Sequence, residues 1–101
     1  MDRRNSILRH FPTLLDRWSG ANAQLRELTT SHQTLRLFLQ FPNRSGFLLI
    51  SCTEPLHIEA PIAWSNAQIA ITLDDGDGYF VLDTGAQVRI RTGGVEVKEF
   101  D

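Results

Sequence analysis

Residues 73–80 read LDDGDGYF, with three aspartates and two glycines between aliphatic and aromatic residues. An EF-hand calcium loop requires acidic residues at positions 1, 3 and 5, glycine at position 6 and glutamate at position 12. A loop that starts at Asp75 has Tyr79 at position 5, and a loop that starts at Asp74 has Gly76 at position 3. Both registers fail, so we interpret Asp74–Gly78 as a hairpin loop rich in turn-forming residues. The sequence leaves open whether this loop ever binds a cation.

The hairpin around this loop is apolar on both faces. A five-residue loop sets three pairs opposite each other: Leu73 with Tyr79, Ile71 with Val81, and Ile69 with Asp83. One face then holds Leu73, Ile71, Tyr79 and Val81, and the other holds Phe80, Leu82 and Ala70. An antiparallel sheet usually keeps one face in water. The hairpin therefore needs two covers, which the N-terminal helix, a second sheet, a barrel wall or another chain can supply.

The residues before the hairpin change period near Gln33. Up to Gly20 the apolar residues recur at helical spacing: Ile7, Leu8, Phe11, Leu14, Leu15 and Trp18. Pro12 either kinks this helix or occupies the first turn of a second one. Residues 21–30 fit either a short helix or an edge strand, and we favour the strand. From residue 33 the period is two, which predicts strands such as TLRLFLQF (34–41), FLLISCT (47–53) and PLHIEAP (55–61).

The last predicted element is a hairpin at Gly93-Gly94. Two glycines accept the positive φ angles of a two-residue turn. Such a turn places Arg91 opposite Glu96 and puts five residues on the core side: Val88, Ile90, Thr92, Val95 and Val97. The chain is thus expected to be one α+β domain over 1–101, helical over 1–20 and mainly β over 21–101. An N-terminal helix packs on a curved, mainly antiparallel sheet of six or seven strands; the alternative is a β-sandwich or barrel with an N-terminal helix.

Charge and composition narrow the class of protein. The chain has 101 residues, a formal net charge of −2 and 42% hydrophobic residues, as expected of one small globular domain. Residues 1–50 carry seven arginines against three acids, whereas residues 51–101 carry nine acids against three bases. The net negative charge argues against nucleic-acid binding. A single cysteine, Cys52, and an N-terminus without a signal-peptide core lead us to expect a soluble cytoplasmic protein.

Few residues in this sequence form a pattern that is typical of catalysis, metal ligation or cofactor binding. Cys52 lies in an apolar strand, where a thiol is usually inert, although His57 is close in sequence. The three histidines lack metal-ligand spacing, and phosphate-loop and dinucleotide fingerprints are absent. We therefore predict no catalytic residue, no metal site and no cofactor. If a ligand site exists, we expect it near His57, Trp64 and Asn66, since a tryptophan in an irregular segment can serve as a binding platform.

The surplus of apolar strand surface favours a non-enzymatic protein-interaction or self-association module. The predicted interface residues are Ile7, Phe11, Trp18, Phe80 and Leu82. The expected partner is a second copy of the chain, as a dimer, or another protein, and not a membrane. The alternative is a small-molecule-binding protein or small enzyme with a pocket near Trp64 and His57.

Overall fold

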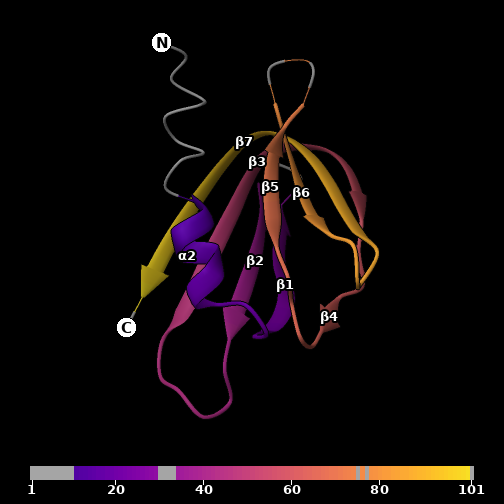
Figure 1. Ribbon diagram of the computed structural model, residues 1–101. Coiled ribbons are helices and arrows are strands. Elements are labelled where there is room, and N and C mark those ends of the chain that lie inside the picture. The colour runs from indigo at the N-terminus through magenta and orange to yellow at the C-terminus, as the bar shows by residue number, and fades with distance from the viewer. Residues whose placement is uncertain (1–10, 30–33, 75, 77, 101) are drawn as a thin grey trace.

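The computed structural model describes residues 11–29, 34–74, 76 and 78–100. These residues form seven strands and one helix: α2 (Phe11–Arg17), β1 (Asn22–Thr29), β2 (Thr34–Gln40), β3 (Phe47–Glu59), β4 (Ala63–Trp64), β5 (Ala70–Leu73), β6 (Tyr79–Asp83) and β7 (Val88–Phe100). The strands make one antiparallel sheet in the order β4-β1-β2-β3-β7-β6-β5, which curls into a half-barrel (Figure 1). The curved, mainly antiparallel sheet predicted from the sequence is confirmed.

Strands form where the sequence has a period of two. In β2, Leu35, Leu37 and Leu39 are buried and the residues between them are not, because successive side chains of a strand point to opposite faces. The same alternation continues through the first half of β3. Residues 22–29 pair with β2 as β1, so the strand interpretation of this segment is confirmed.

The hairpin of β5 and β6 has the predicted register. Leu73 pairs with Tyr79 and Ile71 pairs with Val81. Ile69 precedes the first residue of β5, so the third predicted pair is not part of the ladder. The backbone N–H of Asp74 donates to the carbonyl oxygen of Gly78 at 3.0 Å and closes the loop. Residues 75 and 77, which the cation question concerns, lie outside the described part of the chain.

The predicted hairpin at Gly93-Gly94 is wrong. β7 runs without a turn from Val88 to Phe100, and β3, predicted as two strands, is one strand that pairs with β7 along its length. Neither glycine has a positive φ. What Gly94 provides is space, because a Cβ atom there would lie 2.7 Å from Thr53 Oγ1. The predicted pairing of Arg91 with Glu96 is wrong as well: Arg91 lies opposite His57.

The two long strands bend together at one corner and thereby belong to both halves of the sheet. Figure 1 shows β3 and β7 arching over the top of the molecule. At this corner Glu54 has a φ of 53° and the register of β3 shifts between Pro55 and His57, as in a β-bulge. The hydroxyl of the buried Thr92 donates to the carbonyl oxygen of Thr53 at 2.6 Å and ties the strands together at the bend.

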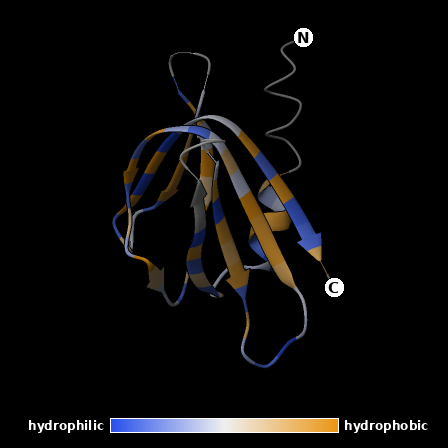
Figure 2. Ribbon diagram, turned by 180° about the vertical axis from the view of Figure 1, so that it is seen from behind, coloured by the Kyte–Doolittle hydropathy of each residue, from blue (hydrophilic) through white to orange (hydrophobic). Residues whose placement is uncertain are grey.

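The core lies on the inner side of the curled sheet. It combines inward residues of both halves with side chains from the N-terminal segment: Phe11, Leu15, Trp18, Ala21, Ala23, Leu35, Leu37, Leu39, Leu48, Ile50, Cys52, Ala67, Val81, Val88 and Ile90. The alternation of apolar and polar residues along the strands is visible in Figure 2. Pro12 is the second residue of α2, in its first turn, where a missing N–H costs no helical hydrogen bond. The sheet thus keeps a separate outer face, which positions the candidate site.

Candidate functional site

The outer side of β2, β3 and β7 carries a group of apolar side chains that we call the aromatic face: Phe38, Phe47, Leu49 and Phe100. Phe38 lies opposite Leu49, and Phe47 lies opposite Phe100, so the four share neighbouring rungs of the sheet. The ring centroids of Phe38 and Phe47 are 5.4 Å apart, and those of Phe47 and Phe100 are 4.8 Å apart. Phe100 keeps 39% of its surface exposed. This face is apolar where an antiparallel sheet is usually polar.

A hollow of about 750 Å³ adjoins the aromatic face, and we call it the amide hollow. It extends from β3 across β2 and β1 to β4. Its lining consists of Asn22, Ala23, Gln24, Arg26, Phe38, Gln40, Phe47, Ala63 and Trp64. The volume lies within the range of roughly 300–1,000 Å³ that is typical of ligand pockets. Two phenylalanines and three side-chain amides give it both an apolar and a hydrogen-bonding surface.

Arg26 is held in a defined position at this hollow. Its Nε and Nη2 donate to Gln24 Oε1 at 3.0 and 2.8 Å, and its guanidinium carbon lies 4.9 Å from the ring centroid of Phe38. Arg26 also lies directly opposite Arg36 on β2. The hollow therefore has a positively charged end.

Trp64 is fixed by a buried carboxylate that was not among the predicted site residues. Asp83, 2% exposed, accepts hydrogen bonds at Oδ2 from Trp64 Nε1 and from the backbone N–H of Gln68, both at 2.9 Å. Its Oδ1 accepts from the backbone N–H of Ala86 at 3.3 Å. Asp83 thus ties β4 and the segment after it to β6. An acidic residue at an inward position of a predicted strand, opposite Val88 in the ladder, was the available signal.

The three predicted ligand-binding residues are not all brought together. Trp64 and Asn66 share a smaller hollow of about 430 Å³ beside Asp83. His57 lies on the second half of β3, opposite Arg91, and lines neither this hollow nor the amide hollow. Of the three, Trp64 alone reaches the amide hollow.

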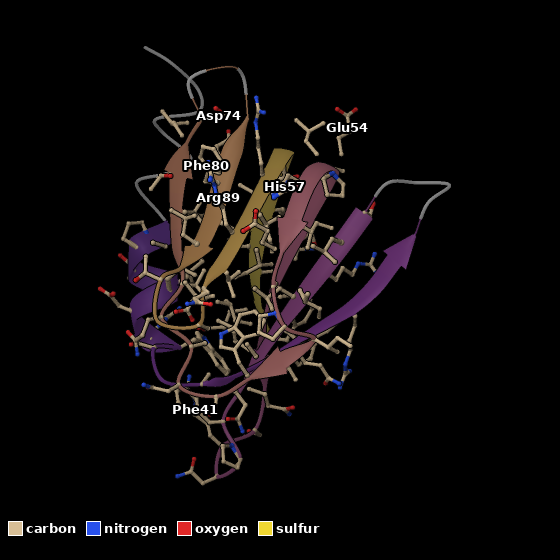
Figure 3. All side chains as sticks on the ribbon, turned by 90° about the vertical axis from the view of Figure 1, so that its right-hand side faces the viewer. Phe41, Glu54, His57, Asp74, Phe80 and Arg89 are labelled. Atoms are coloured by element: carbon tan, nitrogen blue, oxygen red, sulfur yellow. The ribbon has the colours of Figure 1, made fainter. Side chains whose placement is uncertain are left out.

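His57 belongs to a second, charged outer face on the other half of the sheet. Its Nε2 lies 2.5 Å from Glu59 Oε1, and both side chains are more than half exposed. The pKa of the Glu59 carboxyl is lowered by its hydrogen bond to His57, by the charge of His57 and, more weakly, by the charge of Arg89. Figure 3 shows His57 near Arg89 and Phe80. The predicted interface residues Phe80 and Leu82 lie on this face and are half-buried.

The other predicted interface residues lie elsewhere. Phe11 is 6% exposed and Trp18 is 1% exposed, and both belong to the core. Trp18 stacks on Phe41 with ring centroids 5.6 Å apart, and its Nε1 donates to Glu99 Oε2 at 2.7 Å. Ile7 lies outside the described residues.

Among the described residues, the one thiol is buried and no metal-binding cluster is present. Cys52 is fully buried, and desolvation raises the pKa of its thiol to about 12, so that the nucleophilic thiolate is disfavoured. Within the described ranges, no cluster of three or more histidine, cysteine or acidic side chains is placed to hold a metal ion. The arrangement supports binding chemistry through stacking, amide hydrogen bonds and one guanidinium.

Comparison of the chain with protein-family models, curated proteins and solved structures finds no match. No helix in the described part of the chain is long and apolar enough to cross a membrane. The function is therefore inferred from the chemistry of the molecular surface.

Proposed function

We propose that this chain is a non-enzymatic protein-interaction module whose binding surface combines the aromatic face with the amide hollow. The observation that carries the proposal is the set of three phenylalanines and a leucine on the outer side of the sheet. The core is already filled on the inner side, so these side chains are not needed to complete it. Contiguous apolar surface with polar neighbours is typical of interaction sites.

The residues around the aromatic face suit binding more than catalysis. The described residues of the amide hollow include no carboxylate, histidine or cysteine that could act as base or nucleophile. Aromatic and arginine side chains, in contrast, supply most of the affinity in many protein interfaces. Phe38, Phe47 and Arg26 are of these types and lie side by side.

A peptide-display selection tests the proposal. The purified chain is used to select binders from a library of random peptides, and the bound site is mapped by amide chemical shifts in ¹⁵N NMR spectra. We expect shifts concentrated at Phe38, Phe47 and Phe100, and we expect Phe100→Ser to weaken binding. Leu56→Ser is the matched control, since Leu56 is an exposed apolar residue (64%) outside the aromatic face. Binding of a peptide partner is refuted if no peptide binds or if the shifts cluster around Phe80.

Self-association is a second form of the same proposal, favoured by the charges on β7. Glu96 and Lys98 follow one another on the outer side of this strand, two residues apart, next to the aromatic face. In a twofold interface, every contact between two different residues of the two copies forms twice, once in each direction. Lys98 of each copy can therefore pair with Glu96 of the other. Sedimentation velocity at increasing concentration tests this: a dimer that Phe100→Ser dissociates supports it, and a monomer at all concentrations excludes it.

A further inference from the structure

We propose that the amide hollow binds an extended peptide segment of about four residues in which an acidic side chain lies two residues from an apolar or aromatic one. This inference rests on the proposed protein-interaction function and specifies the partner of the same surface. It is based on the dimensions of the hollow, its hydrogen-bonding groups, its apolar floor and its charge.

The dimensions of the hollow set the length of the occupant. The lining residues come from four adjacent strands, β3, β2, β1 and β4, so three interstrand spacings separate Phe47 from Ala63. At about 4.8 Å each, these spacings add up to roughly 14 Å. An extended chain advances about 3.3 Å per residue, so roughly four residues cross the hollow. A volume of about 750 Å³ also holds more than one side chain.

The hydrogen-bonding groups match a polypeptide backbone. Asn22 and Gln40 lie opposite each other on β1 and β2, and both side chains are exposed. A side-chain amide offers two N–H donors and one carbonyl acceptor, and a peptide backbone presents one donor and one acceptor per residue. Gln24 accepts from Arg26 through Oε1, which leaves its NH₂ group to donate. The three amides can therefore pair with both backbone N–H and C=O groups of a crossing strand.

The floor of the hollow is apolar and continues onto the aromatic face. Phe38 and Phe47 line the hollow, and the ring of Phe47 stacks on that of Phe100 outside it. An aromatic side chain of a partner gains about 0.5–1.5 kcal/mol from such ring contacts in addition to its burial. The apolar residue of the bound segment is thus placed over Phe38 and Phe47.

The charge of the hollow selects the acidic residue. Arg26 is the one charged side chain among the described residues of the lining, and it faces Arg36 across the β1–β2 ladder. A carboxylate placed near the Arg26 guanidinium forms charge-assisted hydrogen bonds. Contacts with Gln24 and Phe38 already restrict Arg26, so less side-chain entropy is lost when the carboxylate binds. Arg26 lies next to Phe38, and alternate side chains of an extended chain point to the same side, so the acid is placed two residues from the apolar residue.

Fluorescence anisotropy with two labelled peptides tests this inference. The probes are the strongest peptide from the display selection that contains Phe and Glu two residues apart and the same peptide with Gln in place of Glu. We expect the glutamate peptide to bind the native chain about tenfold or more tightly than the glutamine peptide, with a preference that shrinks at high salt. Arg26→Gln should abolish the preference.

Arg89→Gln is the matched control. Arg89 also stacks on a phenylalanine, with its guanidinium carbon 5.1 Å from the ring centroid of Phe80, but it lies on the other half of the sheet. This variant should keep the tenfold preference and so separates a local effect of Arg26 from a loss of net charge.

Three outcomes overturn the inference. If the two peptides bind equally well at the aromatic face, the inference is overturned but the interaction function stands. The same holds if Arg26→Gln keeps the preference for the glutamate peptide. Tighter binding of a labelled oligothymidylate than of either peptide at this face would assign the surface to single-stranded nucleic acid instead. A display selection without binders removes the peptide-binding form of the proposed function, so the two failures are distinguishable.

Discussion

Removal of the Asp83 carboxylate should destabilise this domain more than most single substitutions. In Asp83→Ala, three donors lose their acceptor: Trp64 Nε1 and the N–H of Gln68, each at 2.9 Å, and the N–H of Ala86 at 3.3 Å. Hydrogen bonds to a charged group contribute about 1.5–3 kcal/mol each. The two short bonds therefore give about 3–6 kcal/mol. Gln68 is exposed, so water can satisfy its N–H in the variant and move the loss toward the lower value. A domain of this size has about 5–15 kcal/mol in total.

Urea unfolding followed by tryptophan fluorescence measures this loss. We expect Asp83→Ala to lower the free energy of unfolding by about 3 kcal/mol and Asp83→Asn, which keeps the shape and one acceptor oxygen, by about half as much. Asp16→Ala is the control: Asp16 is exposed on α2, so the change should stay within about 0.5 kcal/mol. The reasoning fails if Asp83→Ala unfolds within about 1 kcal/mol of the native chain.

Three further predictions concern single positions. Burial raises the pKa of the Cys52 thiol to about 12 from an ordinary value of 9.0, so the folded chain should resist thiol alkylation at pH 8. Above about pH 9 the thiol loses its proton in the unfolded state but keeps it in the folded state. The free energy of unfolding should therefore fall as the pH rises toward 12, which urea titrations at several pH values measure. His57→Gln should raise the pKa of Glu59 toward its ordinary value, observed by NMR titration of the side-chain carboxyl; an unchanged pKa would contradict the assigned cause. Gly78→Ala should cost about 2 kcal/mol, since the added Cβ meets the backbone carbonyl oxygen of Thr92, which cannot rotate away; thermal unfolding without a loss would show that the strands can separate there.

Local patterns were predictable because neighbouring residues determine them. The β5–β6 hairpin has its expected pairs because its short loop leaves few alternative registers. The Gly93-Gly94 prediction failed because a two-residue hairpin turn and a two-residue bend within one strand shift the alternation of inward and outward side chains by the same amount. The hydrophobic pattern therefore fits both. Val95 and Val97 accordingly pack against the core as expected, although no turn precedes them.

The candidate site was less predictable because its members meet only through long-range pairing. The sequence predicted a strand at FLLISCT (47–53), but not that Phe47 would lie between Phe38 and Phe100. Asp83 was missed because its main donor, Trp64, comes from the opposite edge of the sheet.

Hydrophobic periodicity and the short turn sequences determined that this chain is a mainly antiparallel, curved sheet, because side-chain alternation and hairpin turns depend only on residues that are close in the sequence. The tertiary structure decided which strands became neighbours, that β3 and β7 run unbroken through a shared corner, and where the outer phenylalanines, the amides and Arg26 converge. Those features depend on the register between distant segments, which is set by the packing of the whole core.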